Sequence, residues 1–270
     1  MNLYLAGENS KKKIFDFLAG GESRVNLFLA GQDPADQHQK QNLRQKLRPK
    51  ILESFVQVTQ QSVKLLPYYS DYMLDSGAFT MLQGNSKHTD LKQYVDSYAE
   101  YINLYQVKKY FELDIDPIIG YDEVVNIRKY LYKKTGVQPI PVWHKSRGMN
   151  NFKTMCKEYP YVALGGYVLG DFSKKEIVHF PKLIRYAHKH GAKIHGLGFT
   201  MLSMLPKCHF DSVDSTAWLS GNRFGHLYKF NGKTIIKISR PPGTRCKYKE
   251  TAIKNFIEWC KFSKYAEHHL

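Results

Sequence analysis

The sequence predicts an α/β fold, specifically a (β/α)8 barrel of the TIM type. Eight short apolar segments alternate with helix-compatible segments along the 270 residues, which is the order of elements that such a barrel requires. Several of the apolar segments end at aspartate or glycine, where a strand leaves its sheet. A doubly wound sheet is the alternative fold. No GxGxxG motif follows the first apolar segment, so a dinucleotide site has no support.

The expected elements follow one another from the N-terminus. The near copies at 2–7 and 26–31 each predict a short buried strand ended by glycine, with a helix over 11–18 between them. Residues 36–64 predict a helix that Pro49 breaks in two. Eight strands are expected in all, near residues 3, 27, 72, 112, 142, 163, 194 and 212, with later helices near 94–105, 121–134, 152–157 and 174–190.

The composition fits one domain over residues 1–270 with a large core, since 43% of the residues are hydrophobic and 14% aromatic. The 40 lysines and arginines exceed the 24 aspartates and glutamates, for a formal charge of +16. This excess favours a partner with a phosphate backbone, although a basic protein from a lysine-rich proteome would also show it. No segment approaches the ~20 apolar residues of a membrane span, and no cysteines form a CxxC pair. We therefore expect a cytoplasmic protein without membrane contact.

Three of the expected strands end in aspartate, at Asp75, Asp116 and Asp214. One aspartate at a strand end is an ordinary turn residue, but three of them separated by helical segments indicate a site at one face. In a barrel, the loops that follow the strands build this site. We therefore expect one mouth lined by Asp75, Ser76, Phe79, Asp116, His144, Gly165, Gly166, Gly198 and Asp214.

Two aspartates that face each other across a pocket suit glycosyl transfer. One attacks or stabilises the anomeric carbon while the other manages a proton. The glycine pair 165–166 would let backbone N–H groups approach a flat ligand, and Phe79 would stack on it. Asp114, Asp116 and His144 could instead hold a metal ion, but their spacing matches no tight ligand motif. We expect neither a metal nor a cofactor.

The segment 223–270 is basic and rich in aromatic residues, and we expect it to form an extension packed on the barrel. Bases interleaved with aromatics are typical of a nucleic-acid track, but a solvated helix with its aromatics packed inward would show the same pattern. We expect a hairpin over 224–238 that turns at Asn231-Gly232, and a last helix over 251–262. The candidate nucleic-acid ligands are Arg223, Lys237, Arg240, Arg245 and Lys247.

Three motifs carry a resemblance to a known family. The segment Asp75-Ser76-Gly77-Ala78-Phe79 resembles the Asp-Ser-Gly-Gly-Phe/Tyr signature of the tRNA-guanine transglycosylase (queuine tRNA-ribosyltransferase) superfamily. Residues 163–166 resemble its base-binding Gly-Gly strand, and residues 196–198 resemble its Gly-Val-Gly segment before the nucleophile. The chain is short and shows no match to that family's cysteine and histidine zinc site. It is therefore most similar to the compact phage and bacterial branch that places 7-deazaguanines into DNA.

The resemblance implies that guanine in a nucleic acid, DNA rather than tRNA, is exchanged for a 7-deazaguanine such as preQ0 or preQ1. An aspartate attacks the anomeric carbon of a flipped-out guanosine, and Asp75 takes the proton of the incoming base. Asp116 would accept hydrogen bonds from the purine, and the glycine pair 165–166 would donate to it. The protein would act in the host cytoplasm if a phage encodes it, and a homodimer is left open.

The nucleophile has two candidates. The segment 210–213 can be aligned on the family's Phe-Asp-Cys-Val, which selects Asp211, whereas Asp214 stands at the end of the strand before a turn. Strand alternation puts the two on opposite faces, and we favour Asp214. A non-catalytic nucleic-acid-binding barrel and a metal-dependent barrel hydrolase are the alternative functions.

Overall fold

The computed structural model describes residues 1–6, 47–78, 80, 90–224, 226–238 and 248–270. Within these ranges seven strands form one curled sheet in the order β3-β2-β1-β7-β6-β5-β4, and neighbouring strands in it are parallel. The strands are β1 Asn2–Ala6, β2 Lys50–Ser54, β3 Asp71–Asp75, β4 Val142–Trp143, β5 Tyr161–Leu164, β6 Lys193–Gly196 and β7 Ser212–Ser215.

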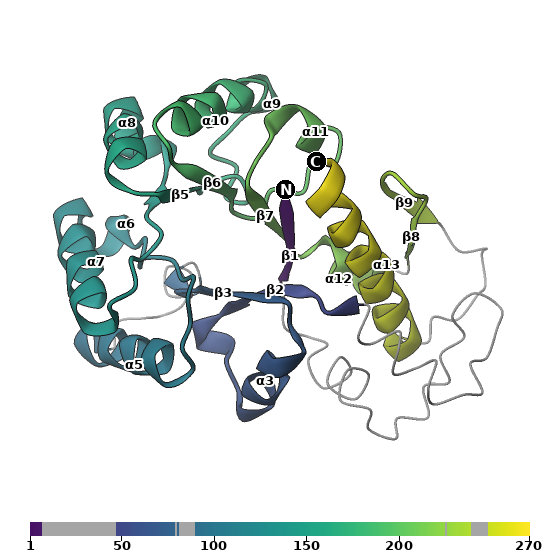
Figure 1. Cartoon of the computed structure of the whole chain (residues 1–270), viewed down its shortest axis with the longest axis horizontal. Helices are drawn as coiled ribbons and strands as arrows, with labels where there is room; N and C mark the ends of the chain where they lie inside the picture. The colour runs from purple at the N-terminus through teal and green to yellow at the C-terminus, as the bar shows by residue number, and fades with distance from the viewer. Residues whose placement is uncertain (7–46, 79, 81–89, 225, 239–247) are drawn as a thin grey trace.

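Helices alternate with the strands and lie around the outside of the sheet (Figure 1). This arrangement confirms the predicted α/β class. The α-helices are α3 Gln60–Leu65, α5 Leu91–Leu104, α6 Asp116–Ile119, α7 Tyr121–Thr135, α8 Gly148–Glu158, α9 Lys174–Ile177, α10 Phe180–Lys189, α11 Leu205–Cys208, α12 Ala217–Phe224 and α13 Tyr248–His269, with 3-10 turns at Phe55–Gln57, Leu66–Tyr68 and Lys145–Arg147. None of the described helices is both long and apolar enough to cross a membrane.

The helix ends follow from local chemistry. The Asp90 carboxylate accepts a hydrogen bond from the backbone N–H of Gln93 and so caps the start of α5. Helix α7 has acidic residues in its first turn and lysines in its last, which complements the helix dipole. It ends at Gly136, whose φ of 68° is the left-handed conformation that glycine adopts without strain. The start of α5 and the end of α7 are therefore set by residues adjacent to them in the sequence.

The two faces of the sheet bury different clusters. The larger cluster lies between the sheet and its helices, and α13 contributes the buried residues Phe256, Trp259 and Phe262 to it. Helix α13 is also tied to β1, because Ser263 Oγ donates to the carbonyl of Leu3 at 2.7 Å. A second buried cluster draws on most of the strands. Its residues are Tyr4, Ala6, Leu52, Met73, Phe111, Ile140, Val142 and Ala163.

The segment around Phe111 lies between the two edge strands. Leu74 of β3 pairs with Tyr110, and Phe111 pairs with Ile140, in isolated parallel bridges. The backbone N–H of Phe111 donates to Leu74 at 3.0 Å, and that of Ile140 donates to Tyr110 at 2.8 Å. Backbone hydrogen bonds therefore connect β3, through residues 110–111, to the chain that enters β4.

Two expected helices differ in the structure. Residues 50–54, expected within a helix over 36–64, form β2 between β1 and β3. The helical expectation is wrong there because pairing on both sides of the strand overrides local propensity. The helix expected over 174–190 is two helices, α9 and α10, with Pro181 in the first turn of the second.

The remaining expectations concern the first repeat and the C-terminal segment. The strand expected near residue 27 lies outside the described residues. The predicted hairpin is confirmed as β8 Leu227–Phe230 and β9 Ile235–Ile238, an antiparallel pair separate from the main sheet. The Asn231 side chain holds its turn by accepting from the N–H groups of Lys233 and Thr234. The last helix is longer than the predicted 251–262.

Candidate functional site

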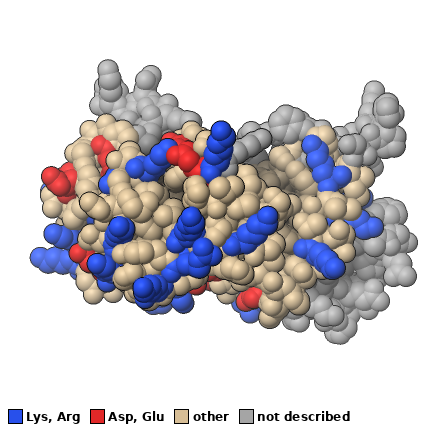
Figure 2. All heavy atoms as spheres, turned by 90° about the horizontal axis from the view of Figure 1, so that it is seen from above, with Lys and Arg blue, Asp and Glu red and all other residues tan. Residues whose placement is uncertain are grey.

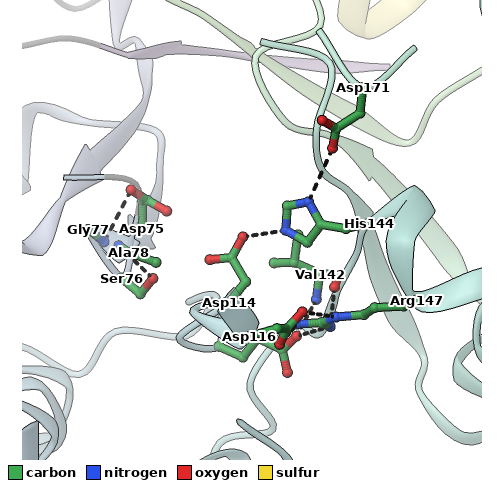
Figure 3. Close-up of polar contacts among 11 residues, drawn as sticks. Asp75, Ser76, Gly77, Ala78, Asp114, Asp116, Val142, His144, Arg147 and Asp171 are labelled. Carbon is green, nitrogen blue, oxygen red and sulfur yellow. Dashed lines mark hydrogen bonds and ion pairs between the residues drawn. The ribbon is translucent and has the colours of Figure 1, made fainter. Parts of the chain in front are cut away.

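The carboxyl ends of the strands bring three aspartates together, which we call the carboxylate cluster: Asp75, Asp114 and Asp214. Asp75 is the last residue of β3, Asp214 lies in β7, and Asp114 follows the segment that is bridged to β3. The charges of Asp114 and Asp214 both act on the Asp75 carboxyl. Figure 3 shows Asp114 between Asp75 and His144, so side chains from separate parts of the chain converge on one space.

Asp75 has a raised pKa. Burial is the main cause, the negative charges of Asp114 and Asp214 add to it, and a hydrogen bond from the Gly77 N–H opposes it, so that the pKa rises from 3.8 to about 7. A carboxyl group with this pKa can both donate and accept a proton near neutral pH. The turn after it is fixed, since Tyr94 donates to the Ser76 carbonyl at 2.5 Å. Gly77 has φ 79°, and a Cβ there would lie 2.8 Å from Val56.

Asp214 is buried and anchored through one oxygen. Its Oδ1 accepts a 2.6 Å hydrogen bond from the Gly198 N–H and lies 3.3 Å from His195 Nε2. Among the described residues, none forms a hydrogen bond with Oδ2. Gly198 is required for this contact, because a Cβ there would collide with the Val168 side chain. An aspartate held by one oxygen, with the other free, suits nucleophilic attack.

Asp114 is held by a histidine. Its Oδ2 lies 2.7 Å from His144 Nε2, and His144 Nδ1 lies 3.9 Å from Asp171 Oδ2 (Figure 3). Burial lowers the pKa of His144, but the hydrogen bond and charge of Asp114 outweigh burial and raise it overall. The pair therefore presents a carboxylate with a histidine behind it, on the opposite side of the space from Asp75.

The glycine pair 165–166 lies against the side chains of His144 and Asp171. A Cβ on Gly165 would lie 2.7 Å from the His144 ring, and a Cβ on Gly166 would collide with Asp171. The N–H of Gly165 already donates to the Trp143 carbonyl at 2.9 Å. The missing side chains therefore make room for His144 and Asp171, and Gly165 has no free N–H for a ligand.

Asp116 does not point into the carboxylate cluster, although its position before Pro117 suggested a strand end. It is the first residue of α6, and Arg147 binds both of its oxygens at 2.6 Å. Arg147 also donates to the buried Glu112 at 2.7 Å, and Glu112 faces Arg128 at 3.2 Å. We call these four residues the arginine network. Arg147 thus binds both Asp116 oxygens, whereas Oδ1 of Asp114 forms no hydrogen bond with a described residue.

Asp211, the other candidate nucleophile, lies at the opposite end of β7. It precedes the strand, and its Oδ2 accepts from the Ile194 N–H at 2.7 Å and faces His188 Nε2 at 2.8 Å. Asp211 and Asp214 are therefore separated by the length of the strand. The structure does not bring Asp211 to the carboxylate cluster.

The expected nucleic-acid ligands are only partly described. Lys237 is exposed on β9, whereas Phe79, Arg240, Arg245 and Lys247 lie outside the described residues, as does the side chain of Arg223. Lysines and arginines spread over the face of the molecule in Figure 2, with few acids among them. The aromatic side chains at 256, 259 and 262 are buried, so they pack in the core and are not available to stack on bases.

Sequence reasoning missed several residues of this site. The sequence indicates Asp114 only as a possible metal ligand. No sequence motif marks Arg147, Asp171 or His195. In the described part of the chain, no group of three or more histidines, cysteines and acids is arranged to hold a metal ion. Comparison with protein-family models and with curated proteins finds no match for this chain. Its function is therefore inferred from the geometry of the carboxylate cluster and the sequence motifs.

Proposed function

We propose that the protein is a base-exchanging transglycosylase that replaces guanine in a nucleic acid, DNA rather than tRNA, with a 7-deazaguanine. One observation carries the proposal. Asp214 is anchored by one oxygen with the other free, and it acts electrostatically on an Asp75 whose pKa is about 7. A nucleophile beside a proton carrier is the pair that glycosyl transfer through a covalent intermediate requires. The resemblance of residues 75–79 and 196–198 to the transglycosylase motifs supports the same reaction.

The proposal includes a closed (β/α)8 barrel as the frame of the site. The bridges from Leu74 to Tyr110 and from Phe111 to Ile140 support it, because a strand at this position would be the eighth and would join the two edges of the sheet. Helices outside a curled sheet of parallel strands agree with this architecture. In such a barrel the carboxyl ends of the strands hold the active site, which is where Asp75 and Asp214 lie.

The first half of the reaction forms an ester on Asp214. The target guanosine is turned out of its stack, and Asp214 Oδ2 attacks C1′ of the sugar. The bond from C1′ to N9 breaks, its electron pair leaves with guanine, and Asp75 gives the departing base a proton. The sugar is then bound to Asp214, the strand stays intact, and Asp75 is ionised.

The second half reverses these steps with a different base. Asp75 takes the N9 proton of the 7-deazaguanine, whose nitrogen attacks C1′ while the bond to Asp214 breaks. Asp214 returns to a carboxylate and Asp75 to its protonated form, so no net proton is consumed. A pKa of about 7 serves both steps, because Asp75 must be acid in one half and base in the other.

Asp114 is the group that we assign to base recognition. Its Oδ2 is held by His144 at 2.7 Å, and no described residue forms a hydrogen bond with its Oδ1. A carboxylate oxygen accepts hydrogen bonds from the N–H groups on the edge of guanine and of 7-deazaguanines alike. This explains how one pocket can take both the leaving and the incoming base.

The proposed function can be tested in cells. DNA and tRNA from cells that express the protein and receive a 7-deazaguanine would be digested to nucleosides and analysed by mass spectrometry. We expect the 7-deazaguanine nucleoside in the DNA, and none in cells that express the Asp214→Asn variant. If the unaltered protein leaves both polymers unmodified while the base is present in the cell, the proposal is wrong.

A further inference from the structure

A line of polar side chains runs between neighbouring strands and ends at Asp214. Tyr161 Oη lies 2.5 Å from Ser212 Oγ, Ser212 Oγ hydrogen-bonds His195 Nδ1, and His195 Nε2 lies 3.3 Å from Asp214 Oδ1. Ser212 and His195 are fully buried. The reaction described above makes no use of the first three residues of this line.

The strand register produces this line. Tyr161, His195 and Ser212 stand on β5, β6 and β7, which are consecutive in the sheet, and His195 pairs with Ser212. Ser212 and Asp214 are two residues apart and therefore point to the same side of β7. The His195 ring can thus reach Ser212 with one nitrogen and Asp214 with the other. Phe111, with its ring centre 5.1 Å away, packs against the imidazole.

The protons in this line can be placed by counting donors. Burial, followed by nearby charges, raises the pKa of Tyr161 despite its bond to Ser212, so Tyr161 keeps its proton and donates to Ser212. Ser212 has one proton and donates it to His195 Nδ1. Nδ1 of His195 is then the acceptor, and the proton that His195 carries on Nε2 faces Asp214. If each hydrogen bond ran the other way, the proton of His195 would be on Nδ1. The lone pair of Nε2 would then face the Asp214 carboxylate and repel it.

We propose that Tyr161, Ser212 and His195 form a positioning chain for the nucleophile, an inference that rests on the proposed function. The Nε2–H of His195 and the N–H of Gly198 fix Oδ1, so Oδ2 is the oxygen that attacks. These two N–H groups orient Asp214 through hydrogen bonds to one of its oxygens. When the incoming base displaces Asp214, the same two N–H groups stabilise the charge that returns to the carboxylate.

The protonation pattern can be tested without substrate. In protein labelled with 15N-histidine, the His195 signal is identified by its absence from His195→Gln, and we expect it to show the proton on Nε2. Tyr161→Phe should shift that signal, because the Ser212 hydroxyl loses its donor. A signal for His195 with the proton on Nδ1 would overturn the inference whatever the reaction.

The kinetic test compares two buried tyrosines. We expect Tyr161→Phe to slow formation of the Asp214–sugar adduct in a single turnover by about 10-fold, the loss of one hydrogen bond, with unchanged affinity for the oligonucleotide. Tyr4→Phe is the matched control. Tyr4 is also buried and hydrogen-bonds Asp71 at 2.5 Å, outside the chain that ends at Asp214, so adduct formation should change less than ~2-fold.

Variants of His195 distinguish a role as hydrogen-bond donor from a role in packing alone. His195→Gln keeps an N–H that can reach Asp214 and should retain much of the adduct rate, whereas His195→Leu should lose roughly 100-fold. Equal rates in the unaltered protein, Tyr161→Phe and His195→Leu would overturn the positioning chain alone. The absence of any adduct in the unaltered protein would overturn the proposed function and this inference with it. Tyr161→Phe preserves the shape of the core, so the comparison does not depend on His195→Leu folding.

Discussion

Carboxylates at the two ends of the parallel sheet have different ion-pair partners. At the carboxyl end, neither Asp75 nor Asp214 forms an ion pair with a lysine or arginine of the described residues. Burial and mutual repulsion act on Asp75 there. At the amino end, the carboxylates have basic partners within 2.5 to 2.8 Å. The pairs are Asp71 with Lys109, Glu267 with Lys50, and Asp211 with His188.

Under the proposed function, this difference separates structural from reactive carboxylates. A paired carboxylate holds two elements together, whereas burial without a cation costs stability and raises the pKa of Asp75. Position at a strand end is therefore not sufficient to identify a reactive acid. Asp116 shows this, because it lies near the carboxyl ends of the strands but is paired through both oxygens with Arg147.

The largest expected effect compares Asp211, which precedes β7, with Asp214, which lies near its carboxyl end. Asp214→Asn should lower the base-exchange rate by at least ~1000-fold, because an amide cannot form the ester intermediate. Asp211→Asn removes only the pair with His188 and should leave the rate within ~3-fold. The rate would be measured as release of labelled guanine from an oligonucleotide. Similar losses in the two variants would contradict the assignment of separate roles.

Nucleic-acid binding is the control for the Asp214 variant. Affinity should change by less than about 3-fold, because binding depends mainly on basic surface residues and on salt. A large loss of affinity together with the loss of exchange would indicate that the substitution damages the fold.

The second effect concerns the arginine network. Arg147→Met removes both hydrogen bonds to Asp116 and leaves the buried Glu112 with Arg128 as its one cation, so it should lower the free energy of unfolding by about 3 kcal/mol. Urea denaturation would measure it. Lys145→Met is the matched control two residues away. It breaks an exposed pair with Glu176, so its unfolding midpoint should be nearly unchanged. Equal destabilisation by both variants would contradict a structural role for the network.

The third and smallest effect is the pH dependence that Asp75 confers. Its pKa is raised from 3.8 to about 7 in the folded protein, so the folded state holds a proton that the unfolded chain releases above about pH 4. The stability from this proton is complete below pH ~4 and is lost as pH rises to ~7. Across this pH range, the free energy of unfolding of Asp75→Asn should therefore rise by on the order of 2 kcal/mol relative to that of the unaltered protein. This free energy is smaller than the whole pKa shift would give, because the Asp75 side chain is partly exposed to solvent.

Urea denaturation of both proteins at about pH 4.5 and about pH 7.5 would measure the gain. A constant difference between them at the two pH values would contradict the raised pKa and weaken the contrast between the two ends of the sheet.

Local patterns predicted the class of fold and much of the site. Apolar runs ended by aspartate or glycine located β1, β3, β5, β6 and β7, because a strand and its exit turn are encoded in adjacent residues. The hairpin at Asn231-Gly232 was predictable for the same reason. The position of Asp75 and Asp214 at one end of the sheet followed from the general rule for parallel strands.

What could not be predicted depends on partners distant in the chain. β2 is a strand because β1 and β3 pair with it on both sides. Asp116 is engaged by Arg147, 31 residues later, so its place beside Asp114 in the sequence could not show which of the two remains free. His195 becomes part of the site only through the register of β6 with β7.

The central claim is that the carboxyl end of the sheet forms a covalent bond to the sugar through Asp214. The most direct measurement is mass spectrometry of the protein denatured during turnover on a guanine-containing oligonucleotide, followed by digestion and sequencing of the modified peptide. We predict one sugar adduct, on Asp214, that disappears when the 7-deazaguanine is added. An adduct on Asp211, or exchange activity with no adduct on any carboxylate, would contradict the claim.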